Sequence, residues 1–278
     1  MKRPTRLAIL FNGAALLVVL ASGAAVLRSV FMPDEVAPCS TRYSHGTQLS
    51  LERSRGELLT AADLQARFGG DDWGLLDNAR VVALKGDPVK PAIEVRLAKV
   101  PGEASRADSR FGMGFTWMPK AMHQTSSACL TYSVLLPSDF DFAKGGRLPS
   151  LLTTAQSQIA GSNPPFRSGW SETGALEVRA QLSGWSDART LASDRSEYVL
   201  RRGQWIALEQ EVVLNTPGQK NGVIRVWVDG ALKFEKTGLA LGDAADVRIS
   251  GVAAEALSTA AATRERKLWF STLELRWQ

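Results

Sequence analysis

The chain alternates apolar and polar residues over many short segments, and this period of two constrains its fold more than any other feature of the sequence. Between Ile93, Val95 and Leu97, for example, stand the charged residues Glu94 and Arg96. Successive side chains of a β-strand point to opposite faces of a sheet, so each such segment predicts a strand with one buried face. The same pattern recurs at residues 130–136, 176–182, 205–214, 223–228 and 267–277.

Turn-forming residues separate these segments. Clusters rich in Gly, Pro, Asn and Asp lie at residues 99–102, 137–139, 216–222 and 238–243. No helices of about ten residues alternate with the segments, so a parallel sheet is not expected. Asp229-Gly230 lies between two alternating runs and predicts a two-residue hairpin turn. We therefore predict an all-β fold, an antiparallel β-sandwich or jelly roll of about a dozen strands.

The sequence predicts three parts in the chain. Residues 1–33 form an N-terminal leader, residues 34–56 are polar and irregular and form a linker or arm, and residues 57–278 form one β domain. Within that domain, residues 58–68 have helical spacing before two glycines, which predicts one short helix. About 240 residues can build a single β core without a second domain.

The leader has the pattern of an export signal. Lys2, Arg3 and Arg6 precede an uncharged stretch, residues 7–27, which Arg28 ends. The stretch fits either a cleaved signal peptide or an uncleaved anchor helix in the inner membrane. In both cases the basic N-terminus stays in the cytoplasm and the remainder crosses the membrane. We expect a periplasmic or secreted protein whose only membrane contact is the leader.

The positive net charge comes mostly from the leader. The chain has 33 Lys and Arg against 28 Asp and Glu, a formal charge of +5. Four of the basic residues lie before the first acidic residue, Asp34, which leaves 29 cations against 28 anions in the rest of the chain. A nucleic-acid-binding protein needs a surplus of cations to neutralise phosphates. Nucleic acid is therefore not an expected partner.

Two cysteines, Cys39 and Cys129, both lie in the part predicted to be exported. In an oxidising compartment they favour one disulfide, and the alternative is two unpaired thiols. His45 and His123 stand at no spacing that would complete a zinc site with them. We expect neither a metal nor a cofactor.

One carboxylate pair offers a possible hydrolytic site. Glu209 and Glu211 stand two apart on a predicted strand and would project from the same face, roughly 6 to 7 Å apart. That distance alone suits glycoside hydrolysis. The pattern Glu-x-Glu is also common on solvated strand faces, so a structural role remains the stronger alternative.

Two separated blocks of the sequence carry a family pattern. Residues 137–142 read Pro-Ser-Asp-Phe-Asp-Phe, and residues 144–149 read Lys-Gly-Gly-Arg-Leu-Pro. Further on, residues 214–218 read Leu-Asn-Thr-Pro-Gly, residues 227–230 read Trp-Val-Asp-Gly, and residues 268–273 form a closing strand. Over residues 105–278 the chain resembles the polysaccharide lyases of the concanavalin A-like jelly-roll type, typified by alginate and glucuronan lyases.

This resemblance implies a β-elimination at a uronic acid of an acidic polysaccharide. Cations neutralise the sugar carboxylate, and a tyrosine or similar group moves the proton. The lysine of the family's Gly-Gly-Lys-Leu-Pro motif corresponds here to Arg147. Residues 177–179, Glu-Val-Arg, are the best local counterpart of its Ser-x-Arg strand, which gives Arg179, and Tyr198 is the counterpart of one of two paired tyrosines. We expect Arg147, Arg179 and Tyr198 to form the catalytic set.

Four more residues are candidates for contacts with the polysaccharide. Lys144 and Glu177 lie beside the expected catalytic residues, and Trp170 and Trp185 flank the Arg179 strand, where aromatic rings could stack on sugars or pack in the core. Glu177 stands where the family has a serine, and a glutamate there would repel a uronate. A non-catalytic protein that binds polysaccharide in exopolysaccharide assembly or recognition is therefore the alternative function.

Overall fold

The structure is a computed structural model that describes residues 36–68, 72–84, 91–98, 111–122, 125–154, 166–241, 247–260 and 266–278. The chain divides into two compact units, Met1–Ala37 and Pro38–Gln278. The predicted leader, residues 1–33, lies outside the described residues. The fold below is that of the second unit.

One sheet of the second unit contains the strands that pair around β6 and β12. In spatial order its strands are β14 (Ala231–Leu239), β13 (Gly222–Val228), β12 (Trp205–Val213), β6 (Ser127–Leu135), β16 (Lys267–Ser271), β4 (Ala92–Arg96) and β3 (Ala79–Val82). Two more strands lie off this path, since β17 (Glu274–Trp277) also pairs with β6, and β1 (His45–Gln48) pairs with β17.

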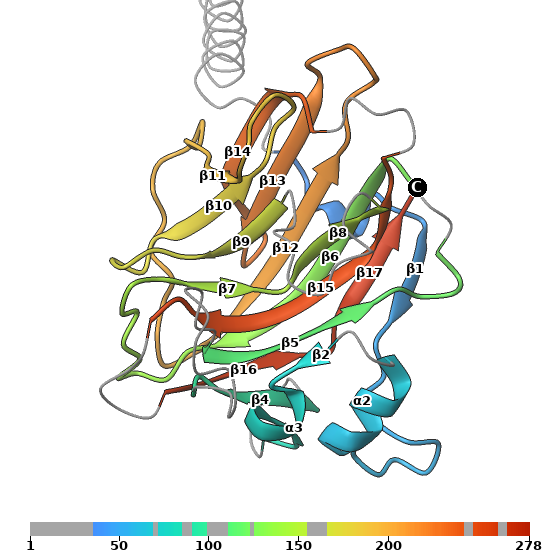
Figure 1. The fold of residues 1–278 in the computed structure, drawn as a ribbon, viewed down its shortest axis with the longest axis vertical. Coiled ribbons are helices and arrows are strands. Elements are labelled where there is room, and N and C mark those ends of the chain that lie inside the picture. Colours follow the sequence, from blue (N-terminus) through green and yellow to red (C-terminus); the bar gives the residue numbers. More distant parts are fainter. Residues whose placement is uncertain are drawn as a thin grey trace, which may run out of the picture. The chain divides into compact units, whose positions relative to one another are not determined.

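The other sheet pairs around β15 and packs against the first as a second layer (Figure 1). In spatial order its strands are β11 (Arg189–Thr190), β10 (Leu176–Ala180), β9 (Phe166–Trp170), β7 (Gly146–Leu148), β15 (Ile249–Ser258), β5 (Phe111–Trp117) and β2 (Asp72–Trp73). Strand β8 (Ser150–Thr153) pairs with β15 off this path. Every pairing among the described strands is antiparallel, as in the pairing of β12 with β6.

The core lies between the two sheets and follows the sequence alternation. On β6, Leu130, Tyr132 and Val134 are buried while the residues between them are partly exposed. On β15, Val252 and Ala254 face the same core. Burial of alternate apolar side chains from both layers is the main stabilising contribution in such a sandwich. The predicted antiparallel β-sandwich is confirmed.

The predicted short helix is α2 (Ala61–Phe68), and a capping box explains where it begins. The backbone N–H of Thr60 donates to the Asp63 carboxylate at 2.7 Å, and the N–H of Asp63 donates to the Thr60 hydroxyl at 3.1 Å. These two bonds satisfy backbone donors that the first helical turn leaves unpaired. Two other short helices are η1 (Cys39–Thr41) and α3 (Leu75–Asn78).

The predicted hairpin joins β13 to β14. Asp229 has a φ of 49° and Gly230 a φ of 79°. Positive φ at both central residues is the signature of a type I′ turn, whose twist matches that of the flanking strands. The Asp229 carboxylate also accepts a hydrogen bond from the N–H of Ala207 at 2.9 Å. This hairpin is confirmed.

Cys39 and Cys129 form a disulfide, as predicted. The bond attaches η1 to the central strand β6, and the chain continues into β1, which the irregular sequence of this segment does not predict. Strand β1 forms because its backbone pairs with the edge of β17, so its side chains need no alternation. The domain limits proposed from the sequence stay a prediction. Within the part of the chain that the structure describes, no helix has the length and apolarity needed to cross a bilayer.

Candidate functional site

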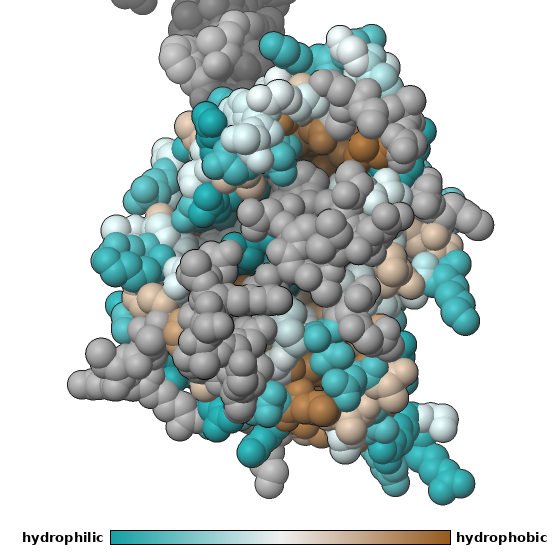
Figure 2. All heavy atoms as spheres, viewed as in Figure 1, coloured by the Kyte–Doolittle hydropathy of each residue, from teal (hydrophilic) through white to brown (hydrophobic). Residues whose placement is uncertain are grey.

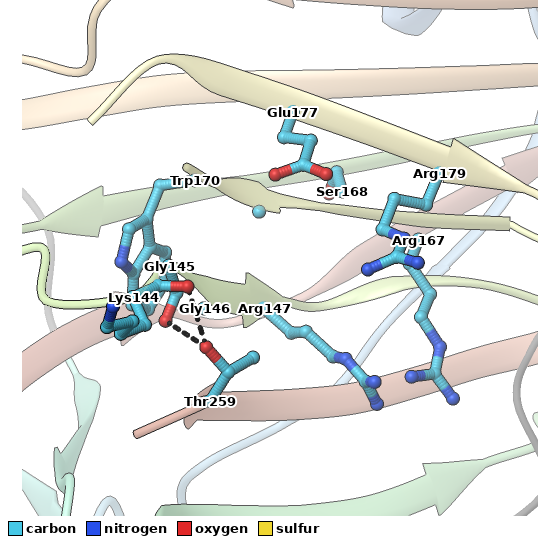
Figure 3. Close-up of a pocket in the computed structure, with 11 residues that line it drawn as sticks. Lys144, Gly145, Gly146, Arg147, Arg167, Ser168, Trp170, Glu177, Arg179 and Thr259 are labelled. Carbon is cyan, nitrogen blue, oxygen red and sulfur yellow. Dashed lines mark hydrogen bonds between the residues drawn. The ribbon is translucent and has the colours of Figure 1, made fainter. Parts of the chain in front are cut away.

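An open pocket lies on the face of the β15 sheet that points away from the core. Strands β7, β9 and β10 supply most of its surface, and Figure 3 shows their side chains around it. In Figure 2 hydrophilic residues gather at the edge of this sheet where β10 and β11 lie. The lining residues are Lys144, Gly145, Gly146, Arg147, Arg167, Ser168, Gly169, Trp170, Glu177, Arg179 and Thr259.

Strand register places the charged side chains on one face. Arg147 of β7 stands opposite Gly169 of β9, which stands opposite Glu177 of β10. In the next row on the same face, Arg167 stands opposite Arg179. Directly opposed residues in antiparallel strands share a face, so all of these side chains project from the sheet together. Gly169 has no side chain, and a Cβ there would overlap the backbone oxygen of Gly146, so glycine lets β7 and β9 lie close together between Arg147 and Glu177.

Trp170 borders the pocket, but its ring packs in the core, where it stands opposite Gly146 of β7. The Trp170 side chain is only 1% exposed, and its indole N–H donates to the backbone oxygen of Phe142 at 3.1 Å. A Cβ at Gly146 would overlap the Trp170 ring, so only glycine lets β7 lie against it. Gly145 has a φ of 92°, which also favours glycine. Trp170 is thus a packed core residue with little surface for stacking on a sugar.

The pocket is strongly cationic. Among the described residues that line it, four side chains are basic and one, Glu177, is acidic. Arg147 forms a long ion pair of 3.8 Å with Glu255 of β15, and the Arg179 guanidinium donates to the backbone oxygen of Ala188 at 3.0 Å. Arg167 is 5% exposed, which is unusual for an arginine that borders a pocket. The surplus of positive charge favours an anionic ligand.

Five of the seven site residues predicted from the sequence come together here. Lys144, Arg147, Trp170, Glu177 and Arg179 all line the pocket. In Figure 3 the arginines occupy one end, and Lys144, Trp170 and Thr259 occupy the other.

Tyr198 and Trp185 do not line the pocket. The Tyr198 ring packs partly buried against the core, and the Lys233 ammonium lies 5.5 Å from its centre. Trp185 is also partly buried, and the Arg189 guanidinium lies 5.0 Å from its ring. All three tyrosines of the chain are described, and none of them lines the pocket. The structure therefore does not bring a tyrosine together with the arginines.

Sequence reasoning missed Arg167 and Thr259. Arg167 stands on β9 three residues before Trp170, so an arginine followed closely by an aromatic residue was the available signal. Every residue of β9 is buried, which hides the alternation that marks other strands. Thr259 follows β15, and its hydroxyl donates to the backbone oxygen of Lys144 at 2.8 Å. That contact joins residues 115 apart and has no local signature.

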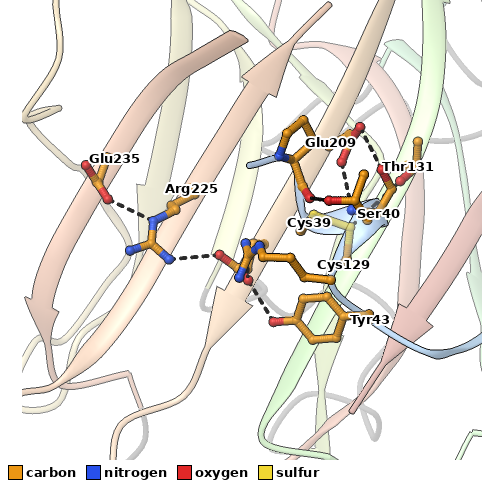
Figure 4. Close-up of polar contacts among 12 residues, drawn as sticks. Cys39, Ser40, Tyr43, Cys129, Thr131, Glu209, Arg225 and Glu235 are labelled. Atoms are coloured by element: carbon orange, nitrogen blue, oxygen red, sulfur yellow. Dashed lines mark hydrogen bonds and ion pairs between the residues drawn. A yellow bond between two sulfur atoms is a disulfide. The ribbon is translucent and has the colours of Figure 1, made fainter. Parts of the chain in front are cut away.

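Glu209 and Glu211 lie on β12 of the other sheet, where both hold the N-terminal arm (Figure 4). The Glu209 carboxylate accepts hydrogen bonds from the N–H and the hydroxyl of Ser40, at 2.9 and 3.0 Å. The Glu211 side chain is fully buried and accepts from Arg42, Tyr43 and Arg225 at 2.8, 2.8 and 3.0 Å. With their oxygens occupied, these carboxylates have a structural role and are not placed to act as a hydrolytic pair.

Burial and the Glu211 carboxylate together raise the pKa of Tyr43 well above its usual range, because the phenol would become an anion beside another anion. Tyr43 therefore stays a hydrogen-bond donor at neutral pH. The adjacent Cys39 and Cys129 also lie near Glu209, but their sulfur atoms are joined to each other and offer no thiolate for a metal.

A model of the family Polysaccharide lyase 14 matches residues 87–259. This is more than half of the chain, and it contains all of the described residues that line the pocket. The chain belongs to the polysaccharide lyase 14 family. The resemblance inferred from the sequence is thus confirmed. No curated protein sequence matches the chain.

Solved structures of other lyases share the fold of this polysaccharide lyase 14 member. An alginate lyase of Aplysia kurodai is 20% identical with a TM-score of 0.65, and the match covers 85% of this chain and 99% of that one. An alginate lyase of a Chlorella virus is 15% identical with a TM-score of 0.62, over 84% and 99%. An endo-β-1,4-glucuronan lyase of Trichoderma reesei is 11% identical with a TM-score of 0.54, over 85% and 96%.

Proposed function

We propose that this protein binds a uronic-acid polysaccharide, with the sugar carboxylate held by the arginines of the pocket. The observation that carries the proposal is that Arg147, Arg167 and Arg179 line one pocket on one sheet face. Guanidinium groups bind carboxylates through two parallel hydrogen bonds and remain charged at any physiological pH. Membership of a polysaccharide lyase family and the alginate and glucuronan lyases that share the fold support this class of ligand.

We infer that β9 is the counterpart of the family's arginine strand. In the family pattern the lysine motif, the arginine strand and the paired-tyrosine strand follow in that order, and here β7, β9 and β10 are neighbours in the same order. Arg167 of β9 then takes the place first given to Arg179. Glu177 and Arg179 of β10 stand where the two tyrosines would be.

Recognition without cleavage is the function that the pocket supports best. β-Elimination needs cations at the carboxylate, which are present, and also a base at the neighbouring C–H. An arginine is a poor base because it gives up its proton only at very high pH. Of the lining side chains that the structure describes, only the Glu177 carboxylate and a neutral Lys144 amine could accept a proton.

Cleavage by β-elimination is the second candidate, with Glu177 as the base. The Glu177 carboxylate accepts a hydrogen bond from the Thr190 hydroxyl and lies across Gly169 from Arg147, so a sugar held by Arg147 would have it within reach. Binding ranks first because it needs only the arginines that line the pocket and no base.

The site of action that we propose is outside the cytoplasm, in the periplasm or beyond. The basic N-terminus followed by uncharged residues 7–27 supports export, with or without an anchor in the inner membrane. The Cys39–Cys129 disulfide supports an oxidising compartment.

Calorimetric titration with polyglucuronate and alginate tests the binding proposal. We expect Arg147→Ala to lower the affinity about tenfold or more, because a charge-assisted contact contributes about 1.5 to 3 kcal/mol. Arg55→Ala is the matched control, since Arg55 is exposed and does not line the pocket. Equal affinities of the two variants and the wild type would contradict the proposal.

Ultraviolet absorbance separates recognition from cleavage. Elimination creates a double bond in the sugar, and this double bond absorbs ultraviolet light. Binding without cleavage creates none, so we expect a flat absorbance trace when the protein is incubated with each polyuronate that it binds. An absorbance that rises with the wild type and stays flat with Arg147→Ala would overturn non-catalytic recognition in favour of the second candidate.

A further inference from the structure

Glu177 is the one acidic side chain that lines the pocket in the part of the chain that the structure describes. It is half-buried on β10, and the Thr190 hydroxyl of the edge strand β11 donates to its Oε1. Among the residues that the structure describes, none forms an ion pair with Glu177, although four cations line the same pocket. Its charge is thus held in place on the pocket surface and is not neutralised by a neighbouring arginine.

The position of Glu177 relative to the arginines gives the pocket two unlike sides. Arg147 and Glu177 stand in one row with Gly169 between them, so their backbones are separated by two strand spacings, roughly 10 Å. A single sugar ring with its substituents fits in such a space. Arg179 stands two residues after Glu177 on the same face of β10, and its side chain points with those of Arg147 and Arg167 towards one end of the pocket (Figure 3). One edge of the ring would then meet the guanidinium groups at that end, and the other edge would meet the Glu177 carboxylate.

A carboxylate that faces a bound sugar accepts hydrogen bonds from hydroxyl groups and repels anions. In a uronate ring the carboxylate and the free hydroxyls lie on different edges of the ring. The arginine side therefore suits the carboxylate, and Glu177 suits the hydroxyls. A sulfate at the hydroxyl edge would place two anions together, and an acetyl ester there would remove the donor that a carboxylate needs.

We propose that Glu177 is a specificity-determining residue that selects uronate rings with free hydroxyls opposite the carboxylate and rejects sulfated or O-acetylated ones. The inference rests on the proposed function, because it assumes that the arginines hold the carboxylate. Thr190 acts as a positioning residue through its hydrogen bond to Glu177.

The test compares the affinities of the full-length protein for unmodified, chemically sulfated and O-acetylated alginate of the same chain length. In Glu177→Gln we expect the affinity for the sulfated polymer to rise about tenfold relative to the unmodified one, because like charges brought together cost at least this much. Affinity for unmodified alginate falls a few-fold. Thr190→Val, on an exposed edge strand, shifts the same ratio in the same direction by a smaller factor.

Glu172→Gln is the matched control, because Glu172 is an exposed carboxylate in the turn between β9 and β10 that does not line the pocket. It removes the same charge from the same region and should leave the ratio unchanged. An equal change in Glu177→Gln and Glu172→Gln, or no change in the ratio for either, would overturn the role of Glu177. Affinities that do not respond to Arg147→Ala would instead overturn the proposed function itself.

Discussion

At the residue scale, the chain uses similar acidic residues in two different ways. Glu211 is fully buried, and two arginines and a tyrosine surround it, so its charge stabilises the attachment of the N-terminal arm. Glu177 lies in a pocket, makes one hydrogen bond to Thr190, and stays open to a ligand. Their sequence contexts look alike, since both stand on alternating strands. The difference comes from what packs above each strand.

Replacing Glu211 tests its structural role. Glu211→Ala leaves three donors without their acceptor, and we expect it to lower the free energy of unfolding by about 2 to 3 kcal/mol. This loss is smaller than that from breaking a fully buried ion pair, because water can solvate Arg42 and Arg225 again. Urea denaturation measures the loss. Affinity for polyuronate should not change, because Glu211 lies on the other sheet. A loss of affinity with unchanged stability would assign Glu211 to a binding or catalytic site instead.

At the element scale, a buried side chain of β12 connects the core to the strands that carry the pocket. Gln210 is fully buried, and its amide nitrogen lies 2.8 Å from the backbone oxygen of Pro149 and 2.5 Å from the Ser168 hydroxyl. Pro149 follows β7, and Ser168 stands on β9 between Arg167 and Gly169. The amide thus helps to fix the two strands that hold Arg147 and Arg167.

We expect Gln210→Leu to affect both stability and binding. The leucine has a similar size but cannot donate, so the Pro149 oxygen loses one of two donors and keeps the Tyr132 hydroxyl, at a cost of about 1 kcal/mol. Denaturation should show that loss, and titration with polyuronate should show a weaker affinity as β7 and β9 move relative to each other. Stability that falls while affinity stays at the wild-type value would mean that Gln210 does not position the pocket.

The cap of α2 gives a pH dependence. Hydrogen bonds from Thr60 and the ion pair with Arg53 hold the pKa of Asp63 below its usual value. A lowered pKa in the folded state means that the carboxylate contributes stability above its unfolded pKa, near 3.9, and that this contribution is lost as the pH falls through the folded value. Asp63→Asn should therefore lower the Tm at neutral pH, and the difference from wild type should narrow in acid. A constant difference across the pH range would contradict this origin.

At the scale of the whole molecule, the disulfide joins the arm to the central strand β6 across 90 residues. A chain closed over such a distance has fewer unfolded conformations, which stabilises the folded state by about 4 to 5 kcal/mol in the entropy model. Ser40 and Arg42 add contacts to Glu209 and Glu211 beside the bond. The arm is thus attached covalently and by hydrogen bonds to the sheet that does not carry the pocket.

The double variant Cys39→Ser with Cys129→Ser should lower the free energy of unfolding by about 2 to 5 kcal/mol. Reduction of the wild type should produce a similar loss, which denaturation with and without a reductant would measure. Affinity for polyuronate should be retained in the folded variant because the pocket lies on the other sheet. Unchanged stability after reduction would show that the hydrogen bonds to the two glutamates suffice to hold the arm.

The site was only partly predictable from the sequence. Lys144 and Arg147 could be found because they lie within a recognisable run of residues, and Arg179 because it stands on an alternating strand. Tyr198 has an equally suitable sequence position, yet its ring lies beside Lys233, away from the pocket. Arg167 was missed because β9 is buried on both faces.

The sequence by itself determined the β-sandwich, the Asp229-Gly230 hairpin, the helix near residue 61 and the pairing of Cys39 with Cys129. These features depend on alternation, on turn residues and on the number of cysteines, all of which are local or compositional. Only the tertiary structure decided that β9 lies between β7 and β10, and that the arm covers Glu209 and Glu211. The physical reason is that a period of two fixes which face of its own strand a side chain takes, whereas strand order and register fix its neighbours, and those depend on packing across the whole chain.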